Sequence, residues 1–286
     1  MTVEVFAPAK INLTLHVTGR RTDGYHLLDS LVVFARDVGD VIHVEAADRL
    51  ELTVEGPFRD GVPTDESNLV VRAARLLQTL RAVQGGARLR LEKNLPHGAG
   101  IGGGSADAAA ALKALALLWN VPTPTPAETL SLGADVPACM AGPTPMRMRG
   151  IGEHLDPVPA LPPLWLVLVN PGRHVSTPRV FSLLGSIHAA DALSMDDMRT
   201  GWDFEAFHAW LSGQGNDLTA CATEEVAEIG HVLDALRSSP GCRKADMSGS
   251  GSTCWGLFKS AAAAHRVAET LAQDFPQWWV RMTAIN

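Results

Sequence analysis

The sequence predicts an α+β protein of two lobes. Strand-like alternation dominates the first half, and segments in the second half follow the order β-α-β-β-α-β, which is the split pattern of ferredoxin-like folds. A chain of 286 residues is long enough to bury two cores. Four prolines cluster between the halves: Pro157, Pro159, Pro162 and Pro163. We therefore predict one domain at residues 1–158 and a second at residues 159–286.

The composition favours an ordinary globular protein. Hydrophobic residues make up 46% of the sequence and charged residues 19%. Charge interrupts every apolar stretch before the roughly 18 residues that a membrane span needs. The N-terminus has no basic segment followed by an apolar block, so no signal peptide is predicted. The net charge of −7, with no basic run to offset it, argues against nucleic-acid binding.

The cysteines indicate a reducing cellular compartment. All four lie far apart in the sequence, without the C-x-x-C spacing of a zinc or redox site. They are Cys139, Cys221, Cys242 and Cys254. Isolated thiols of this kind are typical of reduced cytoplasmic proteins, so we expect a cytoplasmic protein without a membrane partner.

The first half reads as strands interrupted by one early helix. Residues 3–17 alternate between apolar and polar side chains, and a strand would place the polar set, Lys10, Asn12, Thr14 and His16, on one face of a cleft. A turn follows at residues 20–24, and a helix is expected to begin near Asn68. Further strands are expected through residue 33 and at residues 41–44, 50–54 and 87–92.

A glycine-rich loop lies between the strand at 87–92 and an alanine-rich helix at 106–119. The glycines are Gly98, Gly100, Gly102, Gly103 and Gly104. Glycine lets backbone approach a ligand closely, and the N-terminus of the next helix offers unpaired N–H groups and a positive dipole end. The loop from Pro96 to Ser105 is therefore predicted to bind the phosphates of ATP.

Better-known phosphate loops fit this segment less well. Gly98, Gly100 and Gly103 match G-x-G-x-x-G, but residues 119–125 lack the acidic residue that holds the ribose in dinucleotide-binding folds. A Walker loop needs a lysine before Ser105, and the chain has glycine there. The H-R-D and D-F-G signatures of protein kinases are also absent. The segment is therefore predicted to bind phosphate but to belong to none of these three classes.

The second half supplies the remaining elements. A continuous apolar run at residues 164–169 is typical of a buried strand, and residues 122–126 carry three prolines before a short helix at 127–132. Two strands are expected on either side of a turn at residues 248–252. The other expected elements are helices at 204–211, 224–236 and 261–274 and a final strand at 278–284.

Three segments together resemble the motifs of the GHMP kinases. They are Pro8–Leu13, the loop Pro96–Ser105 and the segment Met247–Ser252. The resemblance implies a two-lobed GHMP kinase fold, with an N-terminal lobe like ribosomal protein S5 domain 2 and a ferredoxin-like C-terminal lobe. Residues 19–26 and 132–137 are similar to the 4-diphosphocytidyl-2-C-methyl-D-erythritol kinase family. That family phosphorylates the 2-hydroxyl of a CDP-linked methylerythritol in the non-mevalonate isoprenoid pathway.

The resemblance implies roles for residues at the reacting centre, and further residues are candidates for contacts with ATP and its metal. Asp135 matches the base for the attacking hydroxyl, and Lys10 matches its partner; read without the resemblance, Asp135 is a turn or cap carboxylate. Asn68 and Lys93 are weaker candidates for ATP contacts, and Ser105 is the candidate to touch Mg²⁺. The predicted ATP-binding loop comprises Pro96, His97, Gly98, Ala99, Gly100, Ile101, Gly102, Gly103, Gly104, Ser105 and Ala106.

On the acceptor side, the resemblance implies that Tyr25 and Phe181 stack on cytosine and that His26 hydrogen-bonds the base. Asn12 is a further substrate candidate, and the Asn216 segment is interpreted as a structural helix start. Two departures from the family pattern are Ala106, where relatives often have a second serine, and the pair Ala138–Cys139.

Alternatives stay open at this point. They are another small-molecule kinase of the homoserine or mevalonate type, a nucleotide-binding protein without catalysis, and an NAD-type enzyme on the same glycine pattern. The partner expected is a small molecule, and the chain is expected to be a monomer or a weak homodimer.

Overall fold

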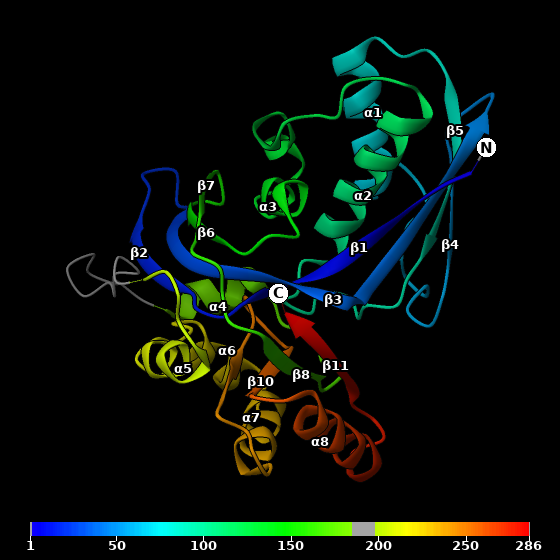
Figure 1. Ribbon diagram of the computed structural model, residues 1–286. Helices are drawn as coiled ribbons and strands as arrows, with labels where there is room; N and C mark the ends of the chain where they lie inside the picture. Colours follow the sequence, from blue (N-terminus) through cyan, green and yellow to red (C-terminus); the bar gives the residue numbers. More distant parts are fainter. Residues whose placement is uncertain (1, 185–197, 286) are drawn as a thin grey trace. The chain divides into compact units, whose positions relative to one another are not determined.

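The computed structural model describes residues 2–184 and 198–285 (Figure 1). Two compact units are interleaved along the chain. The first unit consists of Met1–Ala9, Val38–His97 and Gly102–Gly142, and the second of Lys10–Asp37, Gly98–Ile101 and Pro143–Asn286. The domain boundary between residues 158 and 159 stays a prediction. Within the described residues, no helix combines the length and the apolar character needed to cross a membrane.

The first unit is a sheet with helices. Strand β5 (Gly86–Glu92) pairs antiparallel with residues 41–47 of β3 (His26–Ala47) and parallel with β4 (Glu51–Glu55). Strand β1 (Thr2–Asn12) also pairs with β3. Helix α1 (Leu69–Arg81) packs against α2 (Gly103–Leu118), and α2 contacts α3 (Val136–Ala141). The 3₁₀ helix η1 (Pro126–Leu132) begins with a capping box between Thr125 and Glu128.

The second unit contains a four-stranded antiparallel sheet in the order β11-β8-β10-β9. Its strands are β8 (Leu164–Asn170), β9 (Lys244–Met247), β10 (Cys254–Phe258) and β11 (Trp279–Ile285). Its helices are α4 (Thr177–Leu183), α5 (Phe204–Ser212), α6 (Thr219–Glu225), α7 (Glu228–Ser238) and α8 (Ala261–Asp274). Helices α7 and α8 pack on this sheet (Figure 1). The arrangement confirms the ferredoxin-like order predicted from the sequence.

The early strands of the second unit pair with the first half of β3. Strands β2 (His16–Arg20) and β6 (Met146–Gly150) are both antiparallel to β3, and β7 (His154–Pro157) pairs with β6. The predicted strand at 3–17 is interrupted at residues 13–15. Leu15 instead donates its N–H to the carbonyl of Gly215 at 2.9 Å and accepts from the N–H of Asp217 at 2.9 Å. A partner about 200 residues away in sequence therefore breaks the local strand.

One predicted helix is two helices. The expected helix at 224–236 divides into α6 and α7, because Val226 adopts an extended conformation with φ −136° and ψ 95°. Helices α3 and α4 were not predicted, and both are seven residues or shorter. Periodicity is uninformative over such short segments.

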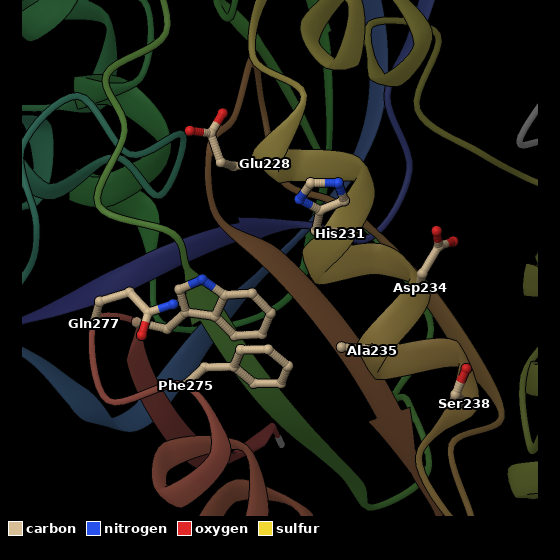
Figure 2. Close-up of a pocket in the computed structure, with 8 residues that line it drawn as sticks. Glu228, His231, Asp234, Ala235, Ser238, Phe275 and Gln277 are labelled. Carbon is tan, nitrogen blue, oxygen red and sulfur yellow. The ribbon is translucent and has the colours of Figure 1, made fainter.

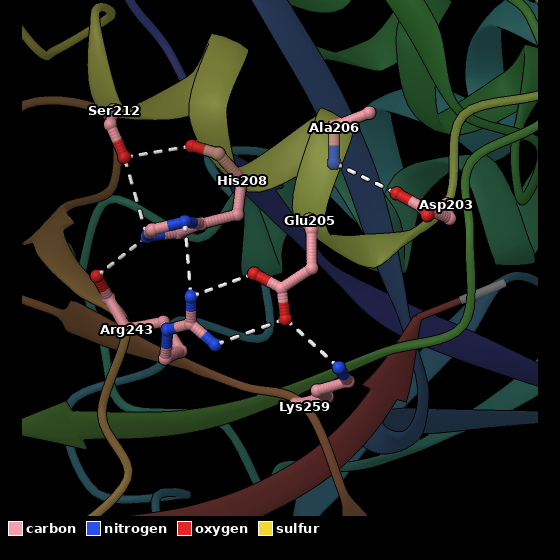
Figure 3. Close-up of polar contacts among 7 residues, drawn as sticks. All are labelled: Asp203, Glu205, Ala206, His208, Ser212, Arg243 and Lys259. Atoms are coloured by element: carbon pink, nitrogen blue, oxygen red, sulfur yellow. Dashed lines mark hydrogen bonds and ion pairs between the residues drawn. The ribbon is translucent and has the colours of Figure 1, made fainter.

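A charged cluster holds α5 to the ends of β9 and β10 (Figure 3). Glu205 accepts hydrogen bonds from Arg243 at 2.8 Å and from Lys259 at 2.9 Å. The same two cations lie 5.5 and 5.7 Å from the centre of the Phe204 ring. Hydrogen bonds from Arg243 and Lys259 lower the pKa of Glu205 to about 2, so this carboxylate is ionised at neutral pH.

Candidate active site

The N-terminal polar residues lie in the second unit and are all buried. Lys10, Asn12, Thr14 and His16 are at most 3% exposed, and the apolar side chains that alternate with them from the end of β1 to the start of β2 are buried as well. The expected alternation is therefore present in chemistry but not in exposure. His16 is hydrogen-bonded at Nε2 to Gln214 at 3.0 Å and faces Asp217 through Nδ1 at 3.4 Å, which assigns it a structural role in this unit.

Asn12 carries a buried acceptor. Its Nδ2 donates to the Ser30 hydroxyl at 2.7 Å, and its backbone N–H donates to the Ser248 hydroxyl at 3.0 Å. Its Oδ1 is among the buried side-chain atoms of the described residues that have no hydrogen-bond partner. A buried acceptor of this kind costs free energy unless a ligand or water donates to it. Asn12 therefore fits the predicted role in binding the substrate.

Two glycine segments meet in the second unit. The Ser248 hydroxyl donates to the carbonyl of Gly100 at 2.8 Å, and the N–H of Thr253 donates to the carbonyl of Ala99 at 3.1 Å. A Cβ atom on Gly100, where φ is +73°, would lie 2.3 Å from the Ser248 carbonyl oxygen. Lys10 is joined to the same place, since its N–H donates to the carbonyl of Ile101 at 2.9 Å. The structure thus brings together the first and third sequence motifs and the residues 98–101 of the second.

The remainder of the glycine-rich loop starts α2 in the first unit. Gly102 is the N-cap residue with φ +64°, and no side chain caps the helix. The first-turn N–H groups of Gly103, Gly104 and Ser105 therefore face no side-chain acceptor of the helix itself, which is the arrangement that binds anions. Ala106 is buried and Ser105 half-buried. Of the predicted loop residues before the glycines, Pro96 is buried, and the exposed His97 makes an edge contact with Phe58.

A buried ionic triad lies beside this helix start, and sequence reasoning found only one of its members. Lys93 donates to the Asp107 carboxylate at 2.7 Å and also to Asp40. The other oxygen of Asp40 accepts from the N–H groups of Asn94 at 2.6 Å and Leu95 at 2.8 Å. The signal for Asp107 is that it is the single acidic residue of an alanine-rich helix. We refer to Asp40, Lys93 and Asp107 as the buried triad.

Both of the weaker candidates for ATP contacts have structural partners, Lys93 in the buried triad and Asn68 in a helix cap. Lys93 is 4% exposed, so its ammonium group is enclosed by the two carboxylates of the triad. Asn68 caps α1, because its Oδ1 accepts from the N–H of Val70 at 2.8 Å and its Nδ2 donates to the Pro63 carbonyl at 2.6 Å. Contacts of these two residues with ATP stay predictions. The Asn216 segment is structural, as predicted: its side chain accepts from Leu218 and donates to two carbonyls of the third motif.

The acceptor-side aromatics are partly brought together. The rings of His26 and Phe181 stack with centroids 4.7 Å apart and an interplanar angle of 21°. Tyr25, at the turn before β3, is 61% exposed. Burial and the nearby Arg20 lower the pKa of His26, so its imidazole is neutral at pH 7 and can both donate and accept. A stacked aromatic beside a neutral imidazole is suited to binding a nucleobase.

Asp135 is placed at the start of α3 in the first unit. It occupies the N-cap position, is half-buried, and its side chain makes no capping hydrogen bond. The cap-carboxylate interpretation of Asp135 is therefore not what the structure shows. Lys10 belongs to the second unit, so the pairing of Lys10 with Asp135 stays a prediction.

A surface pocket in the second unit contains none of the residues predicted for ATP or the acceptor (Figure 2). It has a volume of about 510 Å³ and lies between α7 and the connection from α8 to β11. Phe275 and Trp278 form one wall as a stacked pair, with centroids 3.9 Å apart. Its carboxylates already have cationic partners, since Glu228 pairs with Arg173 and Asp234 with Arg237.

Comparisons with known proteins agree with this geometry. The family description "GHMP kinases N terminal domain" matches residues 68–143, and "GHMP kinases C terminal" matches residues 202–277. The chain is 54% identical over 279 residues to the 4-diphosphocytidyl-2-C-methyl-D-erythritol kinase of Cereibacter sphaeroides, covering 97% of both chains. It is 51% identical to the kinase of the same name from Ruegeria pomeroyi, covering 98% of both.

Solved structures show the same fold. A crystal structure of 4-(cytidine 5'-diphospho)-2C-methyl-D-erythritol kinase is 36% identical, with a TM-score of 0.77 and 99% coverage of both chains. A homoserine kinase from Cytophaga hutchinsonii shares the fold at 18% identity and a TM-score of 0.69. The predicted GHMP kinase fold in two lobes is thereby confirmed. The chain belongs to the 4-diphosphocytidyl-2-C-methyl-D-erythritol kinase family, a branch of the GHMP kinases, which are ATP-dependent phosphotransferases.

Proposed function

We propose that this chain transfers the γ-phosphoryl group of ATP to the 2-hydroxyl of 4-diphosphocytidyl-2-C-methyl-D-erythritol, in the methylerythritol phosphate pathway of isoprenoid biosynthesis. The observation that carries the proposal is the full-length match, at 54% identity, to kinases named for this substrate. The homoserine and mevalonate kinases match at 18% and 14%, which supports the fold alone. The neutral His26 stacked on Phe181 further favours a cytidyl substrate over a small amino acid or mevalonate.

Phosphoryl transfer depends mainly on positioning and on neutralising charge. The uncapped N-terminus of α2 supplies N–H groups and a positive dipole end for the ATP phosphates, and the glycines leave room for them. The segments 98–101 and 247–252, which are hydrogen-bonded to each other, hold the backbone of Lys10 and Asn12. Lys10 would supply positive charge to the transferring group.

Mg²⁺ is the proposed metal. Among the described residues, no group of three or more His, Cys, Asp or Glu side chains could hold a metal ion. Mg²⁺ fits this donor set, because it usually binds nucleotide phosphates with only one or two protein ligands and keeps several waters. The Ser105 hydroxyl, at the start of α2, is the residue that would hold it. When bound, the ion would neutralise charge on the β- and γ-phosphates.

Asp135 is the proposed base for the acceptor hydroxyl. Its carboxylate is half-buried, and the α3 N-terminus beside it lacks a side-chain cap hydrogen bond. A general base contributes typically 10²–10⁴-fold to a rate, so we expect Asp135→Asn to lower kcat by about that factor while ATP still binds. Asp60→Asn is the matched control, because Asp60 lies in the same unit with a side chain that is 98% exposed. Unchanged turnover in Asp135→Asn would contradict the assignment.

One assay tests the substrate. ATP consumption by the full chain would be measured with the cytidyl substrate, CDP, mevalonate and homoserine in parallel. Turnover with the cytidyl substrate alone is expected. Turnover with mevalonate or homoserine would replace this proposal with the other kinase type, and ATP binding without any turnover would indicate a nucleotide-binding protein.

The cellular setting is proposed on narrower grounds. All four cysteines are free, and Cys139 and Cys254 are buried, which fits the reducing cytoplasm. The acidic net charge of −7 fits a small-molecule enzyme without a nucleic-acid or membrane partner. A monomer or weak homodimer is proposed, and light scattering of the purified chain would measure its mass.

A further inference from the structure

We infer that Thr177 and Ser250 are positioning residues that fix the acceptor-side helix α4 to the third motif, Met247–Ser252. The inference rests on the proposed function, because it assigns Phe181, which α4 carries, to the cytidyl site. The Thr177 and Ser250 hydroxyl oxygens are 2.7 Å apart, which is hydrogen-bonding distance. Neither hydroxyl has a role in the mechanism proposed above.

We refer to the segment from Asn170 to Thr177 as the connector. It is hydrogen-bonded to the end of the third motif and to Thr253. Asn170, at the end of β8, donates to the Ser252 hydroxyl at 3.2 Å and to the Thr253 hydroxyl at 2.9 Å. Ser252 in turn donates to the carbonyl of Arg173 at 2.5 Å. These contacts are buried or partly buried, and they fix the connector before it reaches α4.

Within the connector, His174 contacts residues 98–101, the part of the second motif that belongs to the second unit. A Cβ atom on Gly98 would lie 2.8 Å from the His174 ring, so backbone and imidazole are in direct contact. The connector therefore touches both of the glycine segments that meet in the second unit. Its last residue, Thr177, is the first residue of α4.

Helix α4 depends on outside contacts for its position. It has seven residues, and Ser176 at its N-cap makes no side-chain capping hydrogen bond. Isolated helices of this length are unstable in water, so tertiary contacts must hold it. Val180 is fully buried. Arg179 forms an ion pair with Glu225 at 3.5 Å, and the arginine side chain is more than half exposed. Exposed pairs of this kind contribute little.

The Thr177 contact lies where it can set the orientation of Phe181. Residues four apart lie on the same face of a helix, one turn from each other, so Thr177 and Phe181 share a face. Ser250 anchors one end of this face and the His26 ring stacks against the other. A change at Ser250, in a segment assigned to the donor side, should therefore alter binding of the cytidyl group.

The test compares kinetic constants for both substrates in five variants of the full chain. Thr177→Val and Ser250→Ala remove the contact from either side, and the double variant tests whether they act together. Thr177→Ser keeps the hydroxyl. Ser182→Ala is the matched control, because it removes an exposed hydroxyl from the same helix that bonds only to the helix carbonyl of Arg179.

We expect Thr177→Val and Ser250→Ala each to raise KM for the cytidyl substrate about 3- to 10-fold, the range that one lost hydrogen bond of roughly 1 kcal/mol gives. The double variant should be no worse than the worse single variant, and Thr177→Ser and Ser182→Ala should match the wild type. Thr177→Val should leave KM for ATP unchanged. Melting temperatures of the Thr177→Val and Ser250→Ala variants should fall by no more than about 2–4 °C, the shift that a loss of roughly 1 kcal/mol gives.

Additive effects in the double variant, or equal losses in Thr177→Ser and Thr177→Val, would overturn the positioning role. So would an unchanged KM for the cytidyl substrate in both single variants. If Thr177→Val fails to fold, Ser250→Ala decides alone. The wild type in the same assay distinguishes failure of the proposed function from failure of the positioning role. A wild type that consumes no ATP with the cytidyl substrate contradicts the proposed function. An active wild type with unaffected variants contradicts only the positioning role.

Discussion

The buried triad predicts a sharp difference between two Asp→Asn substitutions. Burial raises the pKa of Asp107 well above its usual range, with the Asp40 carboxylate reinforcing the shift and Lys93 opposing it. The pKa of Lys93 is raised in spite of its burial, because both carboxylates stabilise its charge. One ammonium group facing one ionised and one protonated carboxyl is the state that avoids an excess buried charge.

The magnitudes follow from that charge state. Asn is nearly isosteric with a protonated Asp, so Asp107→Asn should change the free energy of unfolding by only about 1 kcal/mol, the value of one hydrogen bond. Asp40→Asn removes a carboxylate that stabilises the charge of Lys93 and weakens the acceptor of two backbone N–H groups. Breaking a buried pair in this way costs about 3–5 kcal/mol. That is a large share of the roughly 5–15 kcal/mol that stabilises a typical domain.

The dependence on pH gives a second signature. A carboxyl whose folded pKa is above its unfolded value of 3.8 contributes stability that is complete below that value and is lost as pH rises through the folded pKa. The wild type therefore loses this contribution on going from pH 4 towards alkaline pH, and Asp107→Asn does not. The cost of Asp107→Asn should accordingly be largest near pH 4 and should shrink as pH increases.

Urea unfolding followed by circular dichroism, at three pH values between 4 and 8, measures both quantities. Asp60→Asn, in the same unit and fully accessible, controls for the loss of one surface charge. A cost of 3 kcal/mol or more for Asp107→Asn that grows with pH would refute the reasoning, because it would show that Asp107 is an ionised partner of Lys93 in the folded protein.

Two further predictions concern ligands. Tyr25→Ala should raise KM for the cytidyl substrate about 5- to 150-fold, from the ~1–3 kcal/mol of one base stack, and should leave KM for ATP alone; equal effects on both would contradict the stacking role. Gly104→Ala should raise the melting temperature slightly, since Gly104 is helical and its nearest neighbour, Leu69, is 3.7 Å from the added Cβ. The same variant should raise KM for ATP, and an unchanged KM would show that the phosphates do not approach Gly104.

Much of the fold followed from local patterns, and the exceptions have non-local causes. The order of strands in the second unit was predictable because β8 is a continuous apolar run and α8 has clear helical spacing. The interruption at residues 13–15 was not, because the competing partner is residues 215–217. The break between α6 and α7 depends on a single extended residue, Val226, which no periodicity marks.

The candidate site shows the same division. The glycine segments and the Tyr25–His26 pair stand out in the sequence by their composition. The buried triad does not, because two strands, a helix and the glycine-rich loop separate Asp40 from Asp107 in the sequence, and the two carboxyls come together around Lys93 only in the folded chain. Lys93 was predicted to contact ATP, and its enclosure by two carboxylates could be seen only in three dimensions.

The glycines of the loop serve two different purposes, packing within the protein and close approach of a ligand, and the sequence pattern does not distinguish them. Gly100 has positive φ and lies against the Ser248 carbonyl, so packing between the two glycine segments requires it even without nucleotide. Gly104 has an ordinary helical conformation, and an added Cβ would make only an ordinary van der Waals contact with Leu69 at 3.7 Å, so nothing in the folded chain requires glycine there. Loss of activity on substituting Gly100 would therefore report on folding of the second unit as much as on phosphate binding. Only positions such as Gly104, where the protein itself tolerates a methyl group, can report on the approach of a ligand.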